Sequence, residues 1–150
     1  KIAQLHSIDS GISVEYRCIS AEALSLEAAH SFDIVTCMEM LEHVPNPASI
    51  VKSCAQLVKP GGKVYFSTLN RNLKSYLFAI VGAEYLLNLL PRGTHDYARF
   101  LKPSELTQYV RESGLTTLSL RGINYQLLTQ KYTLSEDTAI NYLLAAQLDF

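Results

Sequence analysis

Residues Phe32 to Pro47 read F-D-I-V-T-C-M-E-M-L-E-H-V-P-N-P, a run in which apolar residues lead directly into two glutamates and a histidine. The apolar part, 32–38, is nearly continuous and rich in β-forming residues, which is typical of a strand covered on both faces in a parallel sheet. In open α/β sheets, the segment after the carboxyl end of such a strand lines the ligand crevice. The run therefore predicts an α/β fold with a binding site just beyond Met38.

Three potential metal ligands, Glu39, Glu42 and His43, follow this strand. If the chain turns helical after Met38, the i, i+3 and i, i+4 spacings place the two carboxylates and the imidazole on one helix face. Carboxylate oxygens suit a divalent ion such as Mg²⁺, with the imidazole as a less usual third ligand. The alternative is that Glu42 and His43 only begin a helix and hydrogen-bond to nearby loops.

The rest of the chain alternates between helical and strand patterns. Asn46 is a favourable N-cap and Pro47 a favourable first helical residue. Pro60, Gly61 and Gly62 then predict a tight turn. The expected helices are one ending near Gly11, 47–58 and 103–113, with a short helix or loop at 21–29. The expected strands are 13–19, 32–38, 63–69 and 115–120. Residues 141–148 fit a closing edge strand, and the alternative for them is a helix. This order predicts a Rossmann-like, mostly parallel sheet with helices on both faces.

Bulk composition excludes some classes of function. A chain of 150 residues is about one domain, and its net charge of -1 gives no electrostatic reason to bind nucleic acid. The cysteines Cys18, Cys37 and Cys54 have apolar neighbours and no C-x-x-C spacing. They are expected to be buried thiols of a reducing compartment.

The segment Ser75–Leu90 predicts a helix that is apolar on nearly every side. Its 16 residues would span about 24 Å, which is short of the roughly 30 Å hydrocarbon core of a bilayer. Glu84 also disfavours insertion. With Arg71, Lys74 and Arg92 at its ends, the helix is expected to lie on an anionic membrane surface. The alternative is a core or dimer-interface helix.

Three motifs together resemble the ubiquinone-biosynthesis O-methyltransferases, which methylate catechol-type polyprenyl intermediates with S-adenosylmethionine. The motifs are D-I-V-T-C-M-E-M-L-E-H-V-P-N-P at 33–47, L-V-K-P-G-G-K-V-Y-F-S-T-L-N-R-N at 57–72 and V-G-A-E-Y-L-L-N-L-L-P-R-G-T-H-D at 81–96. The first two occur widely among class I methyltransferases, whereas the third is specific to this family. The resemblance implies a polyprenyl catechol substrate and a membership in a ubiquinone-biosynthesis complex. It also implies a cytoplasmic protein peripheral to the inner membrane, or a protein on the mitochondrial matrix face.

The resemblance also assigns cofactor-binding residues. It places S-adenosylmethionine beside Met38, for which the alternative is a plain core methionine. It places the adenine at the loop formed by Ser20, Ala21 and Glu22, which varies among related enzymes. These four residues are the expected cofactor contacts.

The remaining site residues take their roles from the same resemblance. Glu39, Glu42 and His43 match the family's proposed metal site, where an ion would lower the pKa of a catechol hydroxyl. His95, next to Asp96, follows the apolar helix and is the expected general base. A histidine with only a structural hydrogen bond is the alternative.

One feature of the family is missing from these residues. None of the seven glycines forms the G-x-G loop that approaches the methionine part of the cofactor. We therefore expect residues 1–150 to be the carboxyl part of a single methyltransferase domain, with an apolar helical insertion at about 71–96 and weak or absent cofactor binding. The alternatives are a metal-independent small-molecule methyltransferase and a noncatalytic lipid-binding or assembly module.

Overall fold

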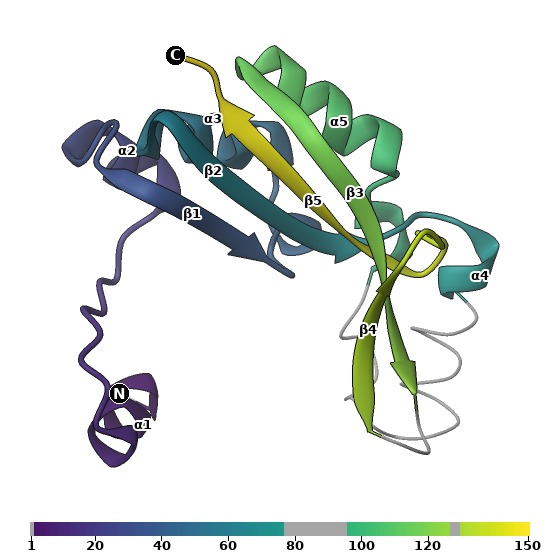
Figure 1. Cartoon of the computed structure of the whole chain (residues 1–150), viewed down its shortest axis with the longest axis horizontal. Helices are drawn as coiled ribbons and strands as arrows, with labels where there is room; N and C mark the ends of the chain where they lie inside the picture. Colours follow the sequence, from purple (N-terminus) through teal and green to yellow (C-terminus); the bar gives the residue numbers. More distant parts are fainter. Residues whose placement is uncertain (1, 77–95, 127–129) are drawn as a thin grey trace.

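The computed structural model describes residues 2–76, 96–126 and 130–150 (Figure 1). Its helical segments are α1 (Ile2–Ser10), α2 (Ala21–Glu27), η1 (Leu41–His43), α3 (Pro47–Leu57), α4 (Leu73–Ser75), η3 (Tyr97–Arg99) and α5 (Pro103–Glu112). Its strands are β1 (Phe32–Met38), β2 (Val58–Leu69), β3 (Leu115–Gln126), β4 (Lys131–Ser135) and β5 (Asn141–Leu148). The expected helices ending near Gly11, at 47–58 and at 103–113 are thus confirmed to within one residue.

The strands form one sheet in the order β1-β2-β5-β3-β4. Only β1 and β2 pair in parallel, joined by the crossover helix α3, and the other three pairings are antiparallel. The described sheet is mixed, with β1, β2 and β3 running in one direction and β5 and β4 in the other, which agrees with the predicted Rossmann-like α/β class. Strand β5 enters between β2 and β3 and runs antiparallel to both, so it is a central strand and not the expected edge strand.

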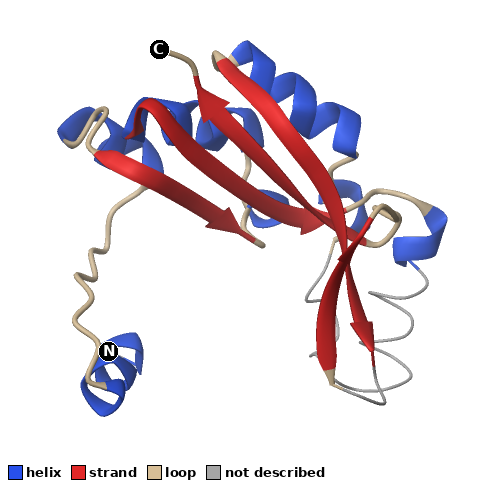
Figure 2. Cartoon of the chain, in the orientation of Figure 1, coloured by secondary structure: helices blue, strands red, loops and turns tan. Residues whose placement is uncertain are grey.

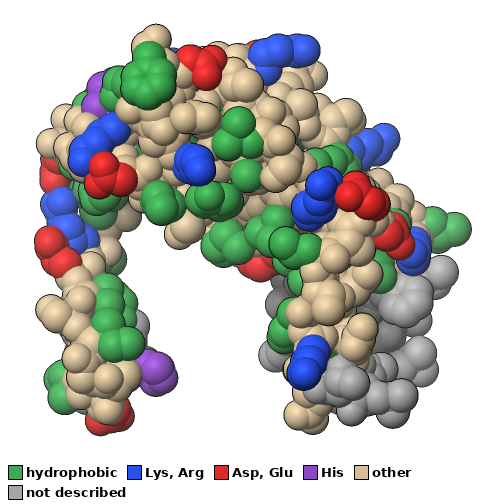
Figure 3. Space-filling model, in the orientation of Figure 1, with side chains coloured by type: hydrophobic (Ala, Val, Ile, Leu, Met, Phe, Trp, Pro, Cys, Tyr) green, Lys and Arg blue, Asp and Glu red, His purple; other side chains and the backbone are tan. Residues whose placement is uncertain are grey.

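Helices α3 and α5 pack on the same face of the sheet (Figure 2). Helix α2 packs mainly against helix α3. Helices on both faces were expected, but among the described residues only this face is covered. The side chains Phe32, Ile34 and Met38 of β1 are accordingly exposed, whereas Cys37, on the opposite side of the strand, is buried. Apolar side chains are visible on the open face in Figure 3.

The core lies between the sheet and the helices α3 and α5. Its largest fully buried apolar side chains include Tyr142, Phe66, Leu106, Leu144, Val51, Val64 and Val110. Helix α3 begins as predicted: the Asn46 side chain accepts a hydrogen bond from the Ser49 amide, and Pro47 occupies the first turn. Buried side chains at Ile50, Val51, Cys54 and Leu57 then recur at the helical period.

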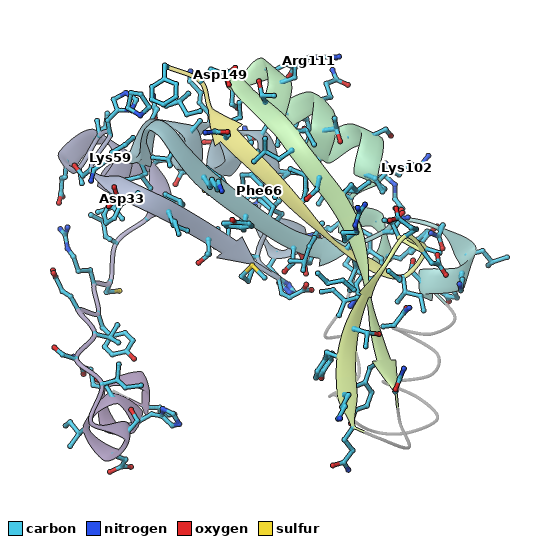
Figure 4. The ribbon with its side chains drawn as sticks, viewed as in Figure 1. Asp33, Lys59, Phe66, Lys102, Arg111 and Asp149 are labelled. Atoms are coloured by element: carbon cyan, nitrogen blue, oxygen red, sulfur yellow. The ribbon has the colours of Figure 1, made fainter. Side chains whose placement is uncertain are left out.

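Two predicted elements differ in the structure. Residues 12–20 form no strand and are largely exposed, because no neighbouring strand in the described chain pairs with them. The Pro60–Gly62 segment does not form a separate turn, since β2 already begins at Val58. Lys59, which lies at this start of β2, forms an ion pair of 2.8 Å with Asp33 of β1 (Figure 4). The lysine holds the pKa of the Asp33 carboxyl below its usual value by hydrogen bond and charge.

The predicted apolar helix and insertion lie mainly at 77–95, outside the described residues. Within 2–76, 96–126 and 130–150, no helix is long and apolar enough to cross a bilayer.

Candidate cofactor site at the end of strand β1

An open cavity of about 750 Å³ lies beside β1. We call it the β1 cavity. Side chains from the segment before α2, from α2 itself, from β1 and from α3 line it, and they include Arg17, Ala21, Leu24, Val35, Met38 and Cys54. Most of these are apolar, while Glu15 and Arg17 add charge from the irregular segment. The cavity therefore has the mixture of apolar wall and few polar groups that is typical of small-molecule sites.

The structure brings two of the four predicted cofactor residues to this cavity, Met38 and Ala21. Ser20 instead caps α2, where its hydroxyl accepts a hydrogen bond from the Ala23 amide at 3.2 Å. Glu22 points to α3, and its carboxylate accepts a hydrogen bond of 3.1 Å from Ser49. Ser20 thus caps α2 and Glu22 links α2 to α3, and neither is among the residues that line the cavity.

The helical face predicted for Glu39, Glu42 and His43 does not form. Glu39 has a φ of 47°, in the left-handed region, so the chain turns sharply after β1. The following residues form only the short 3₁₀ helix η1. Among the residues that the structure describes, no group of three His, Cys, Asp or Glu side chains could hold a metal ion. The spacing argument fails because it assumed a continuous α-helix from Met38.

Glu42 is the buried member of this trio, with 3% of its surface exposed. One carboxylate oxygen, Oε2, accepts a hydrogen bond of 2.7 Å from the Thr68 hydroxyl on β2. The other, Oε1, has no hydrogen-bond partner and no contact with solvent. An orphaned buried acceptor is a place where a cation or donor would fit chemically, but the oxygen is closed off in this arrangement. The three residues therefore do not fit a metal ion as they stand.

The second predicted catalytic feature, His95, lies outside the described residues. Its neighbour Asp96 caps η3, accepting a hydrogen bond of 3.1 Å from the Ala98 amide, and it pairs with Arg99 at 3.4 Å. Asp96 thus has a structural role.

Sequence reasoning missed several contacts around the end of β2. Arg71 forms an ion pair with Glu105 of α5, beside a second cavity of about 230 Å³. Lys74 pairs with Asp137 at 2.8 Å. Both cations were expected at a membrane surface. Their partners are 34 and 63 residues away in the chain, so no local pattern could have revealed them.

A parallel β1–α3–β2 unit with a cavity that runs along its first strand to the carboxyl end is consistent with a Rossmann-like, cofactor-binding sheet. A family model described as a methyltransferase domain matches residues 7–120, and the chain belongs to this family.

Curated relatives are more specific in name. The chain is 60% identical over 147 residues to the ubiquinone biosynthesis O-methyltransferase of Chromobacterium violaceum, a match that covers 98% of this chain and 63% of that protein. The chain thus spans less than two thirds of the length of such relatives. This similarity agrees with the resemblance drawn from the three sequence motifs.

Solved structures support the fold. A methyltransferase of the S-adenosylmethionine-dependent class from Methanosarcina mazei superposes with a TM-score of 0.61 at 19% identity, covering 92% of this chain and 68% of that one. The [4+2]-cyclase SpnF superposes with a TM-score of 0.66 at 14% identity, covering 99% of this chain and 62% of that one. Since one of these is named a cyclase, the fold alone does not determine the reaction.

Proposed function

We propose that this chain is the carboxyl part of an S-adenosylmethionine-dependent O-methyltransferase of ubiquinone biosynthesis, and that the β1 cavity forms part of its cofactor site. The observation that carries the proposal is the position of this cavity, which runs along β1 from Phe32 and reaches its carboxyl end at Met38, with Ala21 also in its lining. The 60% identity to a protein named for this reaction supports it. The proposed substrate is a catechol-type polyprenyl intermediate.

The residues of the chain would act mainly by positioning. When bound, the cofactor supplies an electrophilic methyl group. Leu24 and Val35 supply apolar wall against which the cofactor would pack, and Met38 offers its backbone and soft side chain at the strand end. Holding two reactants in line accounts for a large share of the rate in such transfers. In this proposal His95 is the general base for the substrate hydroxyl.

A nuclear magnetic resonance titration with S-adenosylhomocysteine tests the cofactor site, because it detects weak binding. We expect the signals of Met38, Ala21 and Val35 to shift in a saturable manner. Thr133, exposed on β4, is the internal control and should not shift. Shifts confined to other parts of the chain, or no saturable shift at millimolar ligand, would contradict the placement.

The metal requirement separates two versions of the proposal. In one, Glu42 would help to hold a Mg²⁺ ion that would lower the pKa of the catechol hydroxyl; in the other, the reaction needs no metal. The closed position of the Glu42 Oε1 atom favours the second version. We expect Glu42→Gln and the matched exposed variant Glu22→Gln to bind Mg²⁺ as the unchanged chain does, measured by calorimetry. Loss of Mg²⁺ binding in Glu42→Gln, but not in Glu22→Gln, would instead support the version with a metal site at Glu42.

We also propose that the segment 75–90 lies on an anionic membrane surface, where the polyprenyl tail of the substrate is dissolved, and that the protein works in a ubiquinone-biosynthesis complex at the inner membrane. This part rests on the sequence pattern. Vesicle flotation of Leu86→Asp, which charges the apolar face, should show reduced binding to anionic vesicles relative to Asn88→Asp. Equal flotation of the two variants, with both folded by circular dichroism, would refute it.

A further inference from the structure

Two thiols lie together in the wall of the β1 cavity. Cys37 is on β1 and Cys54 is on α3, and both line the cavity. Each is almost fully buried in the protein, with 4% and 3% of its surface exposed. Both belong to the same cluster of buried side chains, on a strand and a helix that pack against each other. The third cysteine, Cys18, is exposed and does not line the cavity. The open cavity thus gives small molecules a route to a thiol pair that is otherwise enclosed in the core.

The two thiols differ in pKa because each acts on the other. Hydrogen bonding by Cys54 holds the pKa of the Cys37 thiol below its ordinary value, while burial and the charge of Glu42 act in the opposite direction. Hydrogen bonding with Cys37, together with burial, raises the pKa of Cys54. Because the thiolate is the reactive form of cysteine, Cys37 is the expected nucleophile and Cys54 the expected resolving thiol.

We propose that Cys37 and Cys54 form an oxidation site, at which a peroxide entering the β1 cavity joins β1 to α3 by a disulfide. The Cys37 thiolate attacks one peroxide oxygen, the O–O bond breaks, and hydroxide leaves to give a sulfenic acid. The Cys54 sulfur then attacks the sulfenic sulfur, the S–S bond forms, and the hydroxyl leaves with the Cys54 proton as water. In sum, two thiols are oxidised and one hydrogen peroxide is reduced to two waters.

The disulfide would change the cofactor site directly, and this consequence rests on the proposed function. A disulfide holds its sulfurs about 2.0 Å apart, which is closer than two free thiols can approach. Forming it draws α3 toward β1 at the residue next to Met38, in the wall of the cavity. Oxidation should therefore weaken binding of S-adenosylhomocysteine, and bound S-adenosylhomocysteine should slow oxidation by blocking the route to Cys37.

The test uses the whole chain with the exposed thiol removed, Cys18→Ser, so that both core thiols stay native. After treatment with dilute hydrogen peroxide, we expect the intact mass to fall by two hydrogen atoms. Lys52 lies between the two cysteines in the sequence, so trypsin separates them onto different peptides. A disulfide-linked pair of these peptides, lost on addition of dithiothreitol, would be the direct evidence.

Two further variants, Cys37→Ala and Cys54→Ala in the same background, should each give no linked peptide. Peroxide that leaves both thiols free in folded Cys18→Ser protein would overturn the proposal, as would oxidation only at the rate of global unfolding. A linked peptide that forms equally fast with bound S-adenosylhomocysteine would still support the oxidation site. That same result would overturn its link to the cofactor, so the two proposals fail separately.

Discussion

The carboxylate of Glu42 is buried, and only one of its two oxygens is hydrogen-bonded. That oxygen accepts a hydrogen bond from the Thr68 hydroxyl. The sequence marked Glu42 as a polar site residue, but its burial and its partner were not predictable. Both depend on the left-handed turn at Glu39 and on a strand 26 residues further along the chain. The i, i+3 and i, i+4 spacings place side chains on one face only within a continuous α-helix, and the chain forms no such helix after Met38.

At this residue scale, we predict that Thr68→Val lowers the free energy of unfolding by about 1–3 kcal/mol, because the buried carboxylate of Glu42 would lose its remaining donor. Urea denaturation measures the change. Thr133→Val, on an exposed face of β4, is the matched control and should stay within about 0.5 kcal/mol. A double variant with Glu42→Leu should show a smaller loss from the threonine change than Thr68→Val alone. Purely additive effects would mean that the two side chains are not coupled.

The N-cap of α3, Asn46, was predicted from the sequence and is present in the structure. Asn46→Ala should lower the free energy of unfolding by about 0.5–2 kcal/mol, since the Ser49 amide loses its acceptor. Asn46→Asp keeps an oxygen in that place and should retain most of the stability. Equal losses in the two variants would show that the cap contributes little.

At the scale of elements, the sequence identified α3, α5 and β1 because each has a local signature of period or cap. The sequence pattern predicted a strand at 13–19, but these residues form none. A strand needs a neighbouring strand to pair with, and a local pattern does not report whether one is present. It also placed β5 at the edge. The alternating burial of Tyr142, Leu144 and Ala146 shows which face of β5 meets the core. Its central position comes from pairing with β2 on one side and β3 on the other, which is a property of the sheet and not of the segment.

At Gly62, where β2 lies beside β1, the surrounding backbone leaves little room for a side chain. A Cβ atom there would lie 2.8 Å from the Asp33 carbonyl oxygen and 2.9 Å from that of Lys59, both backbone atoms. Gly62→Ala should therefore force the strands apart and cost about 1–3 kcal/mol of unfolding free energy, the range for overpacked sites. Thermal or urea unfolding checks the value.

Val58 distinguishes the cause of this loss, because its Cγ2 atom would also lie 2.7 Å from the added Cβ. Adding Val58→Ala to Gly62→Ala should not recover stability, since the two carbonyl oxygens remain. Recovery would show that the side chain, and not the backbone, limits the space.

At the scale of the whole molecule, the family match confirms the Rossmann-like fold class that the motifs indicated. The layout of the sheet could not be read in the same way. A continuous apolar run such as 32–38 predicts burial on both faces, but which elements supply that cover depends on the tertiary arrangement. In the described residues one face of β1 is bare, and β1 is also the terminal strand of the sheet.

An exposed apolar edge strand is a template for pairing with another chain. Ile34 has 58% of its surface exposed and Phe32 has 40%, both on β1, so we predict that residues 1–150, as a separate polypeptide, self-associate through this edge as their concentration rises. Ile34→Lys should reduce the weight-average mass measured by sedimentation, because a lysine on an edge strand disfavours pairing. Leu26→Lys adds the same charge at a residue of α2 that is 85% exposed, away from any strand, and should leave the association unchanged. Equal effects of the two lysines would assign the association to net charge, and a strictly monomeric parent chain would remove the edge of β1 as an association surface.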